Sequence, residues 1–455
     1  MEKQKSSKKL KTFQKRKIVT KILYTGRTIR RFRPIIPSFG EKKQMKRFLF
    51  MAVLLAVVSC GLTEVGEPVR RPGGDVWTGP GADVGKDDPD KTVFYVTLTD
   101  YPDGYDWRAD RKKGSVKCSL VVLANGIPMM KVPVGDEYEV SSDPDMHRMI
   151  GGHLYTDFST DSETVIKKDG RPLFRYPGRE RIFGMLADSS GVYTLGQPRE
   201  GEGFAYRRNG KILLERTQGR SFGRLYRDGE DICFAFSEQV ASSAGDIERY
   251  YHVRNGEVAQ VALREDVKKV WNITSCERVV HYVADVIGVS DPVVFAGTDM
   301  TVLDMPESAQ MAGCRMIAGP NVVCVEGVSV SQGRPLNAFL WTKPDDYYAF
   351  KAGLTMSSAD CSGGSVFCVL NSPSSSICGQ IYLNGTIVST PFNYMSMSSR
   401  TAAMADGILY VGLSSKTGAK PQLWKDGVLE KLDYNGYICS VTTNKDQASQ
   451  ETVLD

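Results

Sequence analysis

The sequence returns to an Asx-Gly turn at a nearly constant spacing, and this repeat constrains the fold more than any other feature. Asn-Gly and Asp-Gly favour a tight hairpin turn, because both central residues of that turn need a positive φ. Apolar residues flank each copy, as in QLWKDGVLEKL at 422–432. Two weaker copies, at Thr298-Asp299 and Pro344-Asp345-Asp346, complete a series of eight hairpins at intervals of about 43 residues. The glycines of the other six turns are Gly126, Gly170, Gly210, Gly256, Gly385 and Gly427.

A second series of short apolar strands has the same period but is out of phase with the first. Each copy follows a turn, as in SGVYTLG, NVVCVEG and GILYVGL. Two independent markers with one period indicate a repeated structural unit. The central residues of these strands are Tyr95, Tyr155, Tyr193, Cys233, His281, Cys324, Cys368 and Tyr410.

Each unit reads as four short antiparallel strands, and no stretch shows a helical period. One such sheet cannot bury both of its faces alone, so it must stack on its neighbours. Closing the stack into a ring removes exposed strand edges. The sequence therefore predicts an all-β fold, a β-propeller of four-stranded antiparallel blades over residues 92–444. Eight blades fit the spacing, and seven remain if one of the weaker turns is not a hairpin.

The two ends of the repeat predict how the ring closes. The first unit begins with TVFYVTL, which already occupies the position of a second strand. The last unit is followed by a spare strand, GYICSVTTN, at 436–444. We expect this C-terminal strand to complete the first blade beside the N-terminal strand.

Charge is segregated along the chain. Residues 1–50 hold 17 Lys and Arg and only 2 Asp and Glu, whereas the remainder holds 41 and 51, a net charge of −10. Nucleic-acid binding needs a basic surface. The acidic body therefore argues against a nucleic-acid partner, although the whole chain has a formal net charge of +5.

The N-terminal region resembles a bacterial lipoprotein signal. Lys46-Arg47 precede the apolar run 48–58, which is too short to span a bilayer that needs about 20 residues. Cys60 follows directly in VVSCG, which is similar to the lipobox whose Cys becomes the lipidated first residue. The resemblance implies a signal peptide at 45–59 and lipidation of Cys60. An ordinary signal peptide with an incidental Cys is the alternative.

The remaining segments follow from this assignment. Met45 begins a complete signal, so residues 1–44 read as an upstream extension that is not part of the native product. A real basic arm or an uncleaved cytoplasmic tail is the alternative. Residues 60–91 are rich in Gly, Pro and Asp, and predict a lipid anchor followed by a flexible tether. We predict that residues 445–455, after the last strand, form a flexible tail.

The histidines and cysteines give no catalytic or metal signature. His281, Cys233, Cys324 and Cys368 all occupy one blade position, so we interpret them as packing residues. Nine cysteines remain besides Cys60, and an exported protein could pair some of them. Candidate disulfides across neighbouring strands are Cys314–Cys324 and Cys361–Cys368.

The longest loop of the predicted propeller, 99–114, contains the candidate binding residues. Tight Asx-Gly turns occupy one face of the ring, so the loops between second and third strands line the other. Aromatic residues in this loop could stack on a sugar or a protein partner. Its carboxylates around Gly104 could bind Ca²⁺, although their spacing matches no complete calcium motif; otherwise no cofactor is predicted. A solvated loop is the structural alternative. The candidate residues are Tyr101, Asp103, Tyr105, Asp106, Trp107 and Asp110.

The chain as a whole resembles the extracytoplasmic propeller lipoproteins of Bacteroidota-like bacteria. The features that carry this resemblance are the lipobox-type signal, the Gly/Pro tether and the WKDG- and RNG-type repeats. The resemblance implies an outer-membrane lipoprotein of the cell envelope, periplasmic or surface-exposed, that binds an envelope protein or glycan without catalysis. The alternative is a carbohydrate-active hydrolase or lyase that uses carboxylates on the long-loop face. No residue is nominated as catalytic.

Overall fold

The structure, a computed structural model, describes residues 77–444 apart from short gaps. The gaps are 85–90, 109–117, 135–146, 161, 199–201, 223–224, 242, 244–245, 306–309, 320–321, 332–333, 343–345, 351–352, 363–364, 373, 375–376 and 398–399. Within the described ranges, no helix has the length and apolar character that a membrane span requires.

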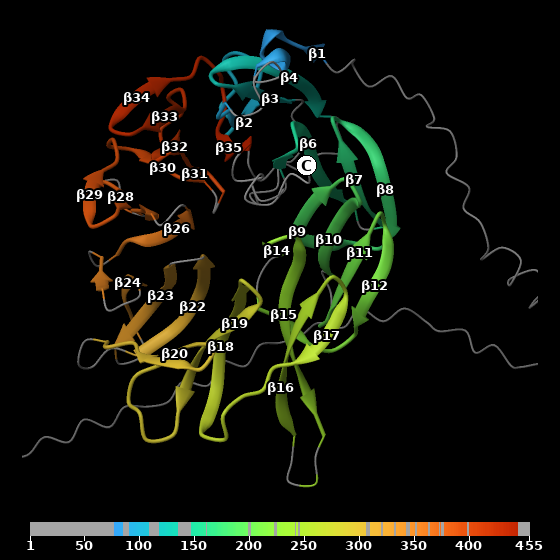
Figure 1. Ribbon diagram of the computed structural model, residues 1–455. Coiled ribbons are helices and arrows are strands. Elements are labelled where there is room, and N and C mark those ends of the chain that lie inside the picture. Colours follow the sequence, from blue (N-terminus) through green and yellow to red (C-terminus); the bar gives the residue numbers. More distant parts are fainter. Residues whose placement is uncertain are drawn as a thin grey trace, which may run out of the picture. The chain divides into compact units, whose positions relative to one another are not determined.

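The described strands pair into eight antiparallel sheets that follow one another around a ring (Figure 1). The eight-bladed propeller that the sequence predicts is therefore confirmed, and the seven-bladed alternative is excluded. Blade 1 contains β1 (Trp77–Thr78), β2 (Phe94–Asp100), β3 (Cys118–Ala124), β4 (Ile127–Val134), β35 (Ile438–Thr443) and a short 3-10 helix, η1 (Pro80–Asp83). Blade 2 contains β5 (His147–Ile150), β6 (His153–Ser159), β7 (Glu163–Lys168) and β8 (Arg171–Pro177).

The other blades keep the same order of strands, from the innermost strand to the outermost. In blades 4 and 8 the innermost strand is split into two pieces. Blade 3 contains β9 (Glu180–Asp188), β10 (Gly191–Pro198), β11 (Phe204–Arg208) and β12 (Lys211–Arg216). Blade 4 contains β13 (Arg220–Ser221), β14 (Tyr226–Asp228), β15 (Asp231–Val240), β16 (Ile247–Arg254) and β17 (Glu257–Gln260). Blade 5 contains β18 (Val267–Cys276), β19 (Val279–Val286), β20 (Val293–Ala296) and β21 (Asp299–Val302). Blade 6 contains β22 (Gln310–Gly319), β23 (Val322–Ser331), β24 (Arg334–Thr342) and β25 (Asp346–Ala349). Blade 7 contains β26 (Thr355–Ser362), β27 (Ser365–Asn371), β28 (Gln380–Leu383) and β29 (Thr386–Ser389). Blade 8 contains β30 (Tyr394–Met395), β31 (Ala402–Ala405), β32 (Ile408–Ser415), β33 (Gln422–Lys425) and β34 (Val428–Lys431).

The C-terminal strand closes the ring, as the sequence predicts. β35 pairs antiparallel with β2, so that Thr443 lies opposite Phe94 and Ile438 lies opposite Leu98. β35 thereby supplies the innermost strand that the first unit lacks. Ile438 is fully buried in an apolar cluster that joins blade 8 to blade 1.

The apolar core is divided into eight clusters, and each cluster lies between two neighbouring blades. Among the described residues there is consequently a core at every blade boundary, including the boundary between the last blade and the first. The blade-position residues that the sequence assigns to packing are all buried: Tyr95, Tyr155, Tyr193, Cys233, His281, Cys324, Cys368 and Tyr410. This interpretation is confirmed, because their side chains fill these inter-blade cores or lie within the sheets.

The six Asx-Gly turns have positive φ at both central residues, as at Asn384 (44°) and Gly385 (87°). The structure adds a second reason why the first of these residues is Asn or Asp. The Asn384 side-chain oxygen accepts a hydrogen bond from the Val366 backbone N–H at 2.8 Å, and the Asn384 backbone N–H donates to the Val366 carbonyl. The turn is thus tied to the start of the second strand. The same pair of bonds recurs at Asn125, Asp169, Asn209 and Asn255.

Substitutions at Asn384 should separate these two contributions. Asn384→Gly keeps the positive φ but loses the side-chain bond, and we expect it to lower the free energy of unfolding by about 1 kcal/mol. Asn384→Ala also forces a residue with a Cβ into the left-handed region, so its loss should be about 1 kcal/mol larger. Urea denaturation of both variants measures the difference. Equal losses would show that the side-chain bond accounts for the whole preference.

Blade 1 begins earlier than the sequence predicts. β1 lies within the range 60–91 that we predict as a tether, yet Trp77 and Thr78 pair with Lys131 and Met130 on the outer edge of β4. An outer strand needs only backbone donors and acceptors to gain a partner. Backbone pairing alone can therefore add two residues of a Gly- and Pro-rich segment to the sheet. Residues 60–76 and 85–90 lie outside the described part of the chain.

Candidate binding site

The candidate binding loop, which follows β2, lies where the last blade joins the first. The loop after β2 lies beside the loop between β32 and β33 and beside the segment that leads from β34 into β35. A cavity of about 360 Å³ opens between these three segments. Its lining residues are Asp103, Gly104, Tyr105, Asp106, Trp107, Arg108, Thr417, Gly418, Lys420 and Asn435.

Two aromatic residues anchor the loop in the core below it. Tyr101 and Trp107 are each only 4% exposed, and they belong to the cluster between blades 1 and 2. The Trp107 ring packs against Tyr437 with ring centroids 5.1 Å apart, and Tyr101 stacks on the half-buried Tyr105 at 5.4 Å. Burial raises the pKa of Tyr101 well above its usual range. Tyr101 therefore stays neutral and serves to position the loop.

Hydrogen bonds from the side chain and the backbone of the closing segment hold the described part of the loop, residues 101–108. Asn435 donates from its side-chain amide to the carbonyls of Pro102 and Tyr105, at 2.8 and 3.1 Å. The Asn435 backbone carbonyl accepts a hydrogen bond from the Tyr101 backbone N–H at 2.8 Å. On the other side, Arg108 donates to the carbonyl of Lys416 in blade 8. The loop is thus held by the last blade as well as by the first.

The six predicted binding residues divide into three groups. Asp103 and Asp106 are exposed at the cavity, and Tyr105 is half-buried beside them. Tyr101 and Trp107 are buried, so little of either ring is open to a ligand, although Trp107 also lines the cavity. Asp110 lies outside the described residues. Sequence reasoning missed Lys420 and Asn435, which lie more than 300 positions away and reach the loop only because the ring closes there.

The described residues contain no group of three or more His, Cys, Asp or Glu side chains arranged to hold a metal ion. Near the loop, Asp106 accepts a hydrogen bond from the Arg108 N–H at 3.1 Å. Asp433 forms an ion pair with Lys420. The cavity is thus lined by the acidic groups of Asp103 and Asp106 and by the basic groups of Arg108 and Lys420. This mixture of charges suits a polar ligand.

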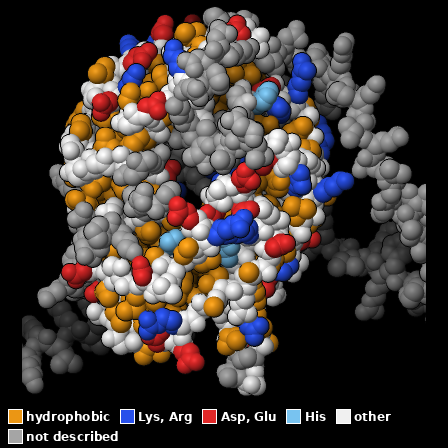
Figure 2. All heavy atoms as spheres, viewed as in Figure 1, with side chains coloured by type: hydrophobic (Ala, Val, Ile, Leu, Met, Phe, Trp, Pro, Cys, Tyr) orange, Lys and Arg blue, Asp and Glu red, His pale blue; other side chains and the backbone are white. Residues whose placement is uncertain are grey.

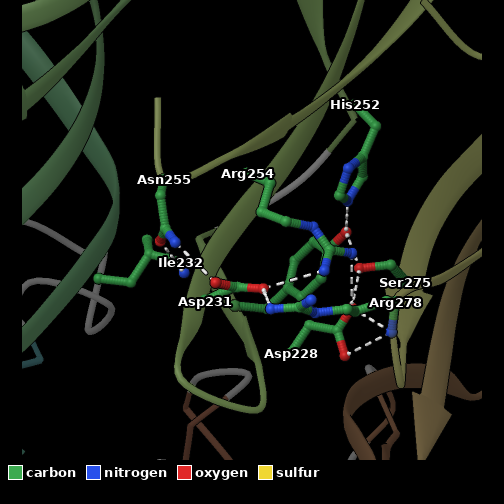
Figure 3. A network of polar contacts seen from close by, with 9 residues as sticks. Asp228, Asp231, Ile232, His252, Arg254, Asn255, Ser275 and Arg278 are labelled. Carbon is green, nitrogen blue, oxygen red and sulfur yellow. Dashed lines mark hydrogen bonds and ion pairs between the residues drawn. The ribbon is translucent and has the colours of Figure 1, made fainter. Parts of the chain in front are cut away.

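A second polar group of residues lies between blades 4 and 5, at the face of the tight turns. Figure 2 shows acidic, basic and histidine side chains near the centre of the ring where these blades lie. In Figure 3, the Arg254 guanidinium lies between the carboxylates of Asp228 and Asp231, at 3.1 and 2.9 Å. Asp228 also accepts hydrogen bonds from the Ser275 hydroxyl at 2.8 Å and from the Arg278 backbone N–H at 3.0 Å. The network therefore links a turn of blade 4 to a turn of blade 5.

His252 and Tyr226 also take part in this network. His252 is buried and hydrogen-bonds through Nε2 to the Tyr226 hydroxyl at 2.9 Å. Burial, with the positive charge of Arg254, lowers the pKa of His252 to about 4, so the ring is neutral near pH 7. Burial also raises the pKa of Tyr226 well above its usual range. Neither group therefore changes charge near neutral pH, and the Tyr226 hydroxyl of blade 4 also donates to the Ser275 hydroxyl of blade 5 at 3.4 Å.

His252 predicts a defined pH dependence of stability. Its pKa is about 4 in the folded state and 6.5 without perturbation, so the unfolded chain binds the extra proton between these values. The stabilisation is complete above pH 6.5 and is lost as the pH falls toward 4, by about 3 kcal/mol. His252→Gln should remove this part of the pH dependence. Denaturation curves at pH 7.5 and pH 4.5 measure the difference, and an unchanged slope in the variant would contradict the assignment.

The predicted disulfides do not form in this structure. Within the sheets, Cys314 lies opposite Gly327 and Cys324 lies opposite Ile317, so these two cysteines are out of register. Cys361 and Cys368 are likewise offset along β26 and β27. The nine described cysteines are all thiols.

Comparison with known proteins gives a likeness of fold only. No protein-family profile and no curated protein matches the sequence. Among solved structures, the β-propeller domain of the Trilobed protease from Pyrococcus furiosus matches at 9% identity and a TM-score of 0.39, over 66% of this chain and 95% of that one. The acylaminoacyl peptidase of Pyrococcus horikoshii matches at 10% identity and a TM-score of 0.40. The match covers 72% of this chain and 57% of the peptidase. TolB from Acinetobacter baumannii matches at 9% identity and a TM-score of 0.34, and the match covers 77% of this chain and 82% of TolB. The chain spans little more than half the length of the peptidase. The assignment of an eight-bladed propeller rests on the strand pairing described above.

Proposed function

We propose that this protein is a lipid-anchored β-propeller of the cell envelope that binds a protein or glycan partner without catalysis. The observation that supports a binding role is the loop at the ring closure. Buried aromatics and hydrogen bonds from Asn435 hold its described part, residues 101–108, while Asp103, Tyr105 and Asp106 remain at the surface beside Lys420. A site that is already ordered loses little conformational entropy on binding.

The size and polarity of the cavity favour a small polar feature of the partner. A volume of about 360 Å³ lies at the lower end of ligand sites in proteins. Exposed carboxylates beside an ammonium and a guanidinium group can accept and donate hydrogen bonds in the same small area. A sugar residue or a polar loop of a protein presents hydroxyl or amide groups that match such a surface.

The lipid anchor of this proposal rests on Cys60, which lies outside the described residues. Fractionation of cells that express the wild-type chain or Cys60→Ser tests it. We expect the wild type in the membrane fraction with a mass increase from acylation, and the variant without that mass increase. A peptide from residues 1–44 in the native product would contradict the assignment of the signal.

A thermal-shift screen tests the binding role and identifies the class of partner. The purified protein is heated with a panel of host and plant polysaccharides, in Ca²⁺ and in EDTA. A ligand that binds only the folded state raises Tm by mass action. A shift with one glycan identifies that glycan as the partner, and a shift that EDTA abolishes shows that Ca²⁺ takes part. If every sugar is inactive, capture from native envelopes with the immobilised protein should recover a protein partner.

A further inference from the structure

Three cysteines lie near the turn between the first and second strands of three consecutive blades. Cys276 is the last residue of β18, Cys361 is the residue before the end of β26, and Cys324 is the third residue of β23. In each blade this is the end where the first strand turns into the second. Because the blades stack around the ring, these positions bring cysteines of neighbouring blades together.

Cys324 and Cys361 lie on the two sides of the boundary between blades 6 and 7, where β23 packs against β26. Cys324 is part of the apolar cluster that fills this boundary, and Cys361 packs against the same cluster. Within its own sheets, Cys324 lies opposite Ile317 and Thr342, and Cys361 lies opposite Val366. Neither cysteine therefore lies opposite another cysteine within its own sheet, and the boundary cluster brings the two together from adjacent blades.

The two thiols differ in access to solvent. Cys324 is completely buried, whereas Cys361 is partly exposed. The hydrogen bond with Cys361 and burial raise the pKa of Cys324 well above its ordinary value. An oxidant from solution can consequently reach Cys361 first, and Cys324 is placed to react second.

We propose that Cys324 and Cys361 form a disulfide between blades 6 and 7 when the chain meets an oxidant of the disulfide class. The Cys361 thiolate attacks the oxidant RSSR, which forms a mixed disulfide and releases one thiolate RS⁻. Cys324 then loses its proton and attacks the sulfur of Cys361, which releases the second RS⁻. Two protein thiols are oxidised and one RSSR is reduced to two RSH. This inference does not depend on the binding role of the loop face.

Disulfide mapping tests the proposal on the full chain. One sample of native protein is incubated with oxidised glutathione, and a second sample is refolded from denaturant in the same oxidant. Free thiols are then counted under denaturing conditions, and cross-linked peptides are identified by mass spectrometry. We expect two fewer thiols than in the reduced protein and a linked pair of peptides that contain Cys324 and Cys361. The reaction should be slower in the native sample, because Cys324 is buried.

Single substitutions assign the pair. Cys324→Ser and Cys361→Ser should each abolish the cross-link, whereas Cys368→Ser, in the same apolar cluster, should leave it intact. Cys276→Ser is the second control, since Cys276 lies within electrostatic range of Cys361. A full complement of free thiols in both samples would overturn the proposal. A cross-link between Cys276 and Cys361 in its place would overturn it equally.

Discussion

Deletion of residues 434–455 should abolish the cooperative thermal transition of this protein. β35 is the only strand within the described part of the chain that joins the C-terminus of the repeat to the first blade, and its pairing with β2 closes the ring. Ile438 and Val441 are buried in the cluster between blades 8 and 1. Truncating one large buried apolar side chain costs about 2–5 kcal/mol, whereas a whole domain is stable by only about 5–15 kcal/mol. Removal of the entire strand therefore exceeds what the remaining contacts can offset.

The matched control for this deletion is removal of residues 445–455 alone. That variant keeps β35 and Asn444, whose side chain accepts from the Val93 N–H at 2.8 Å. Differential scanning calorimetry should show a single transition close to that of the wild type. A cooperative melt in the longer deletion, at an unchanged Tm, would show that the ring does not depend on its closing strand.

Arg207→Met should destabilise the protein by about 3–5 kcal/mol. The Arg207 guanidinium binds the Glu180 carboxylate through two hydrogen bonds of 2.6 and 2.7 Å, and both side chains are less than 10% exposed. The substitution leaves the Glu180 charge buried without its counter-ion. Gly196 leaves room for this ion pair, because a Cβ at that position would lie 2.5 Å from Glu180 Oε2.

A double variant separates the charge from the packing. Glu180→Gln with Arg207→Met removes the buried charge and keeps the shape of the side chain at 180, so we expect it to recover more than half of the lost stability. Urea denaturation of the four proteins of this cycle gives the coupling energy. If the double variant is as unstable as Arg207→Met, the loss comes from the contact of Arg207 with the Tyr176 ring, at 4.5 Å, and not from the charge.

The architecture could be predicted because its determinants are local and repeated. An Asx-Gly pair specifies a hairpin by its own backbone preference, and one packing position recurs as Tyr, Cys or His in each blade. The closing strand could be predicted for a related reason: one unit has a strand too few and the chain ends with a strand too many. No comparable signal marks β1, because its two residues join the sheet through backbone groups that any sequence provides.

The site could be predicted only in part. The length and composition of 99–114 indicate a loop with aromatic and acidic residues, but they do not show which rings face inward. Tyr101 and Trp107 are buried because the closing segment, with Tyr437, covers them. The network around Asp228 occurs between one pair of blades, so it leaves no period in the sequence. The packing of Cys324 and Cys361 at one inter-blade cluster follows from the stacking of blades, which the spacing of cysteines along the chain does not reveal.

The most direct test of the binding role compares two charge-neutral double variants with the wild type. Asp103→Ala with Lys420→Ala removes one acid and one base at the cavity. Glu257→Ala with Lys211→Ala removes the same two kinds of group from exposed positions on outer strands. Affinity for the ligand that the thermal-shift screen or the envelope capture identifies is then measured by titration calorimetry. We predict a loss of tenfold or more in the cavity variant, since hydrogen bonds to charged groups contribute about 1.5–3 kcal/mol, and no change in the control. Equal affinities for all three proteins would contradict binding at the ring closure.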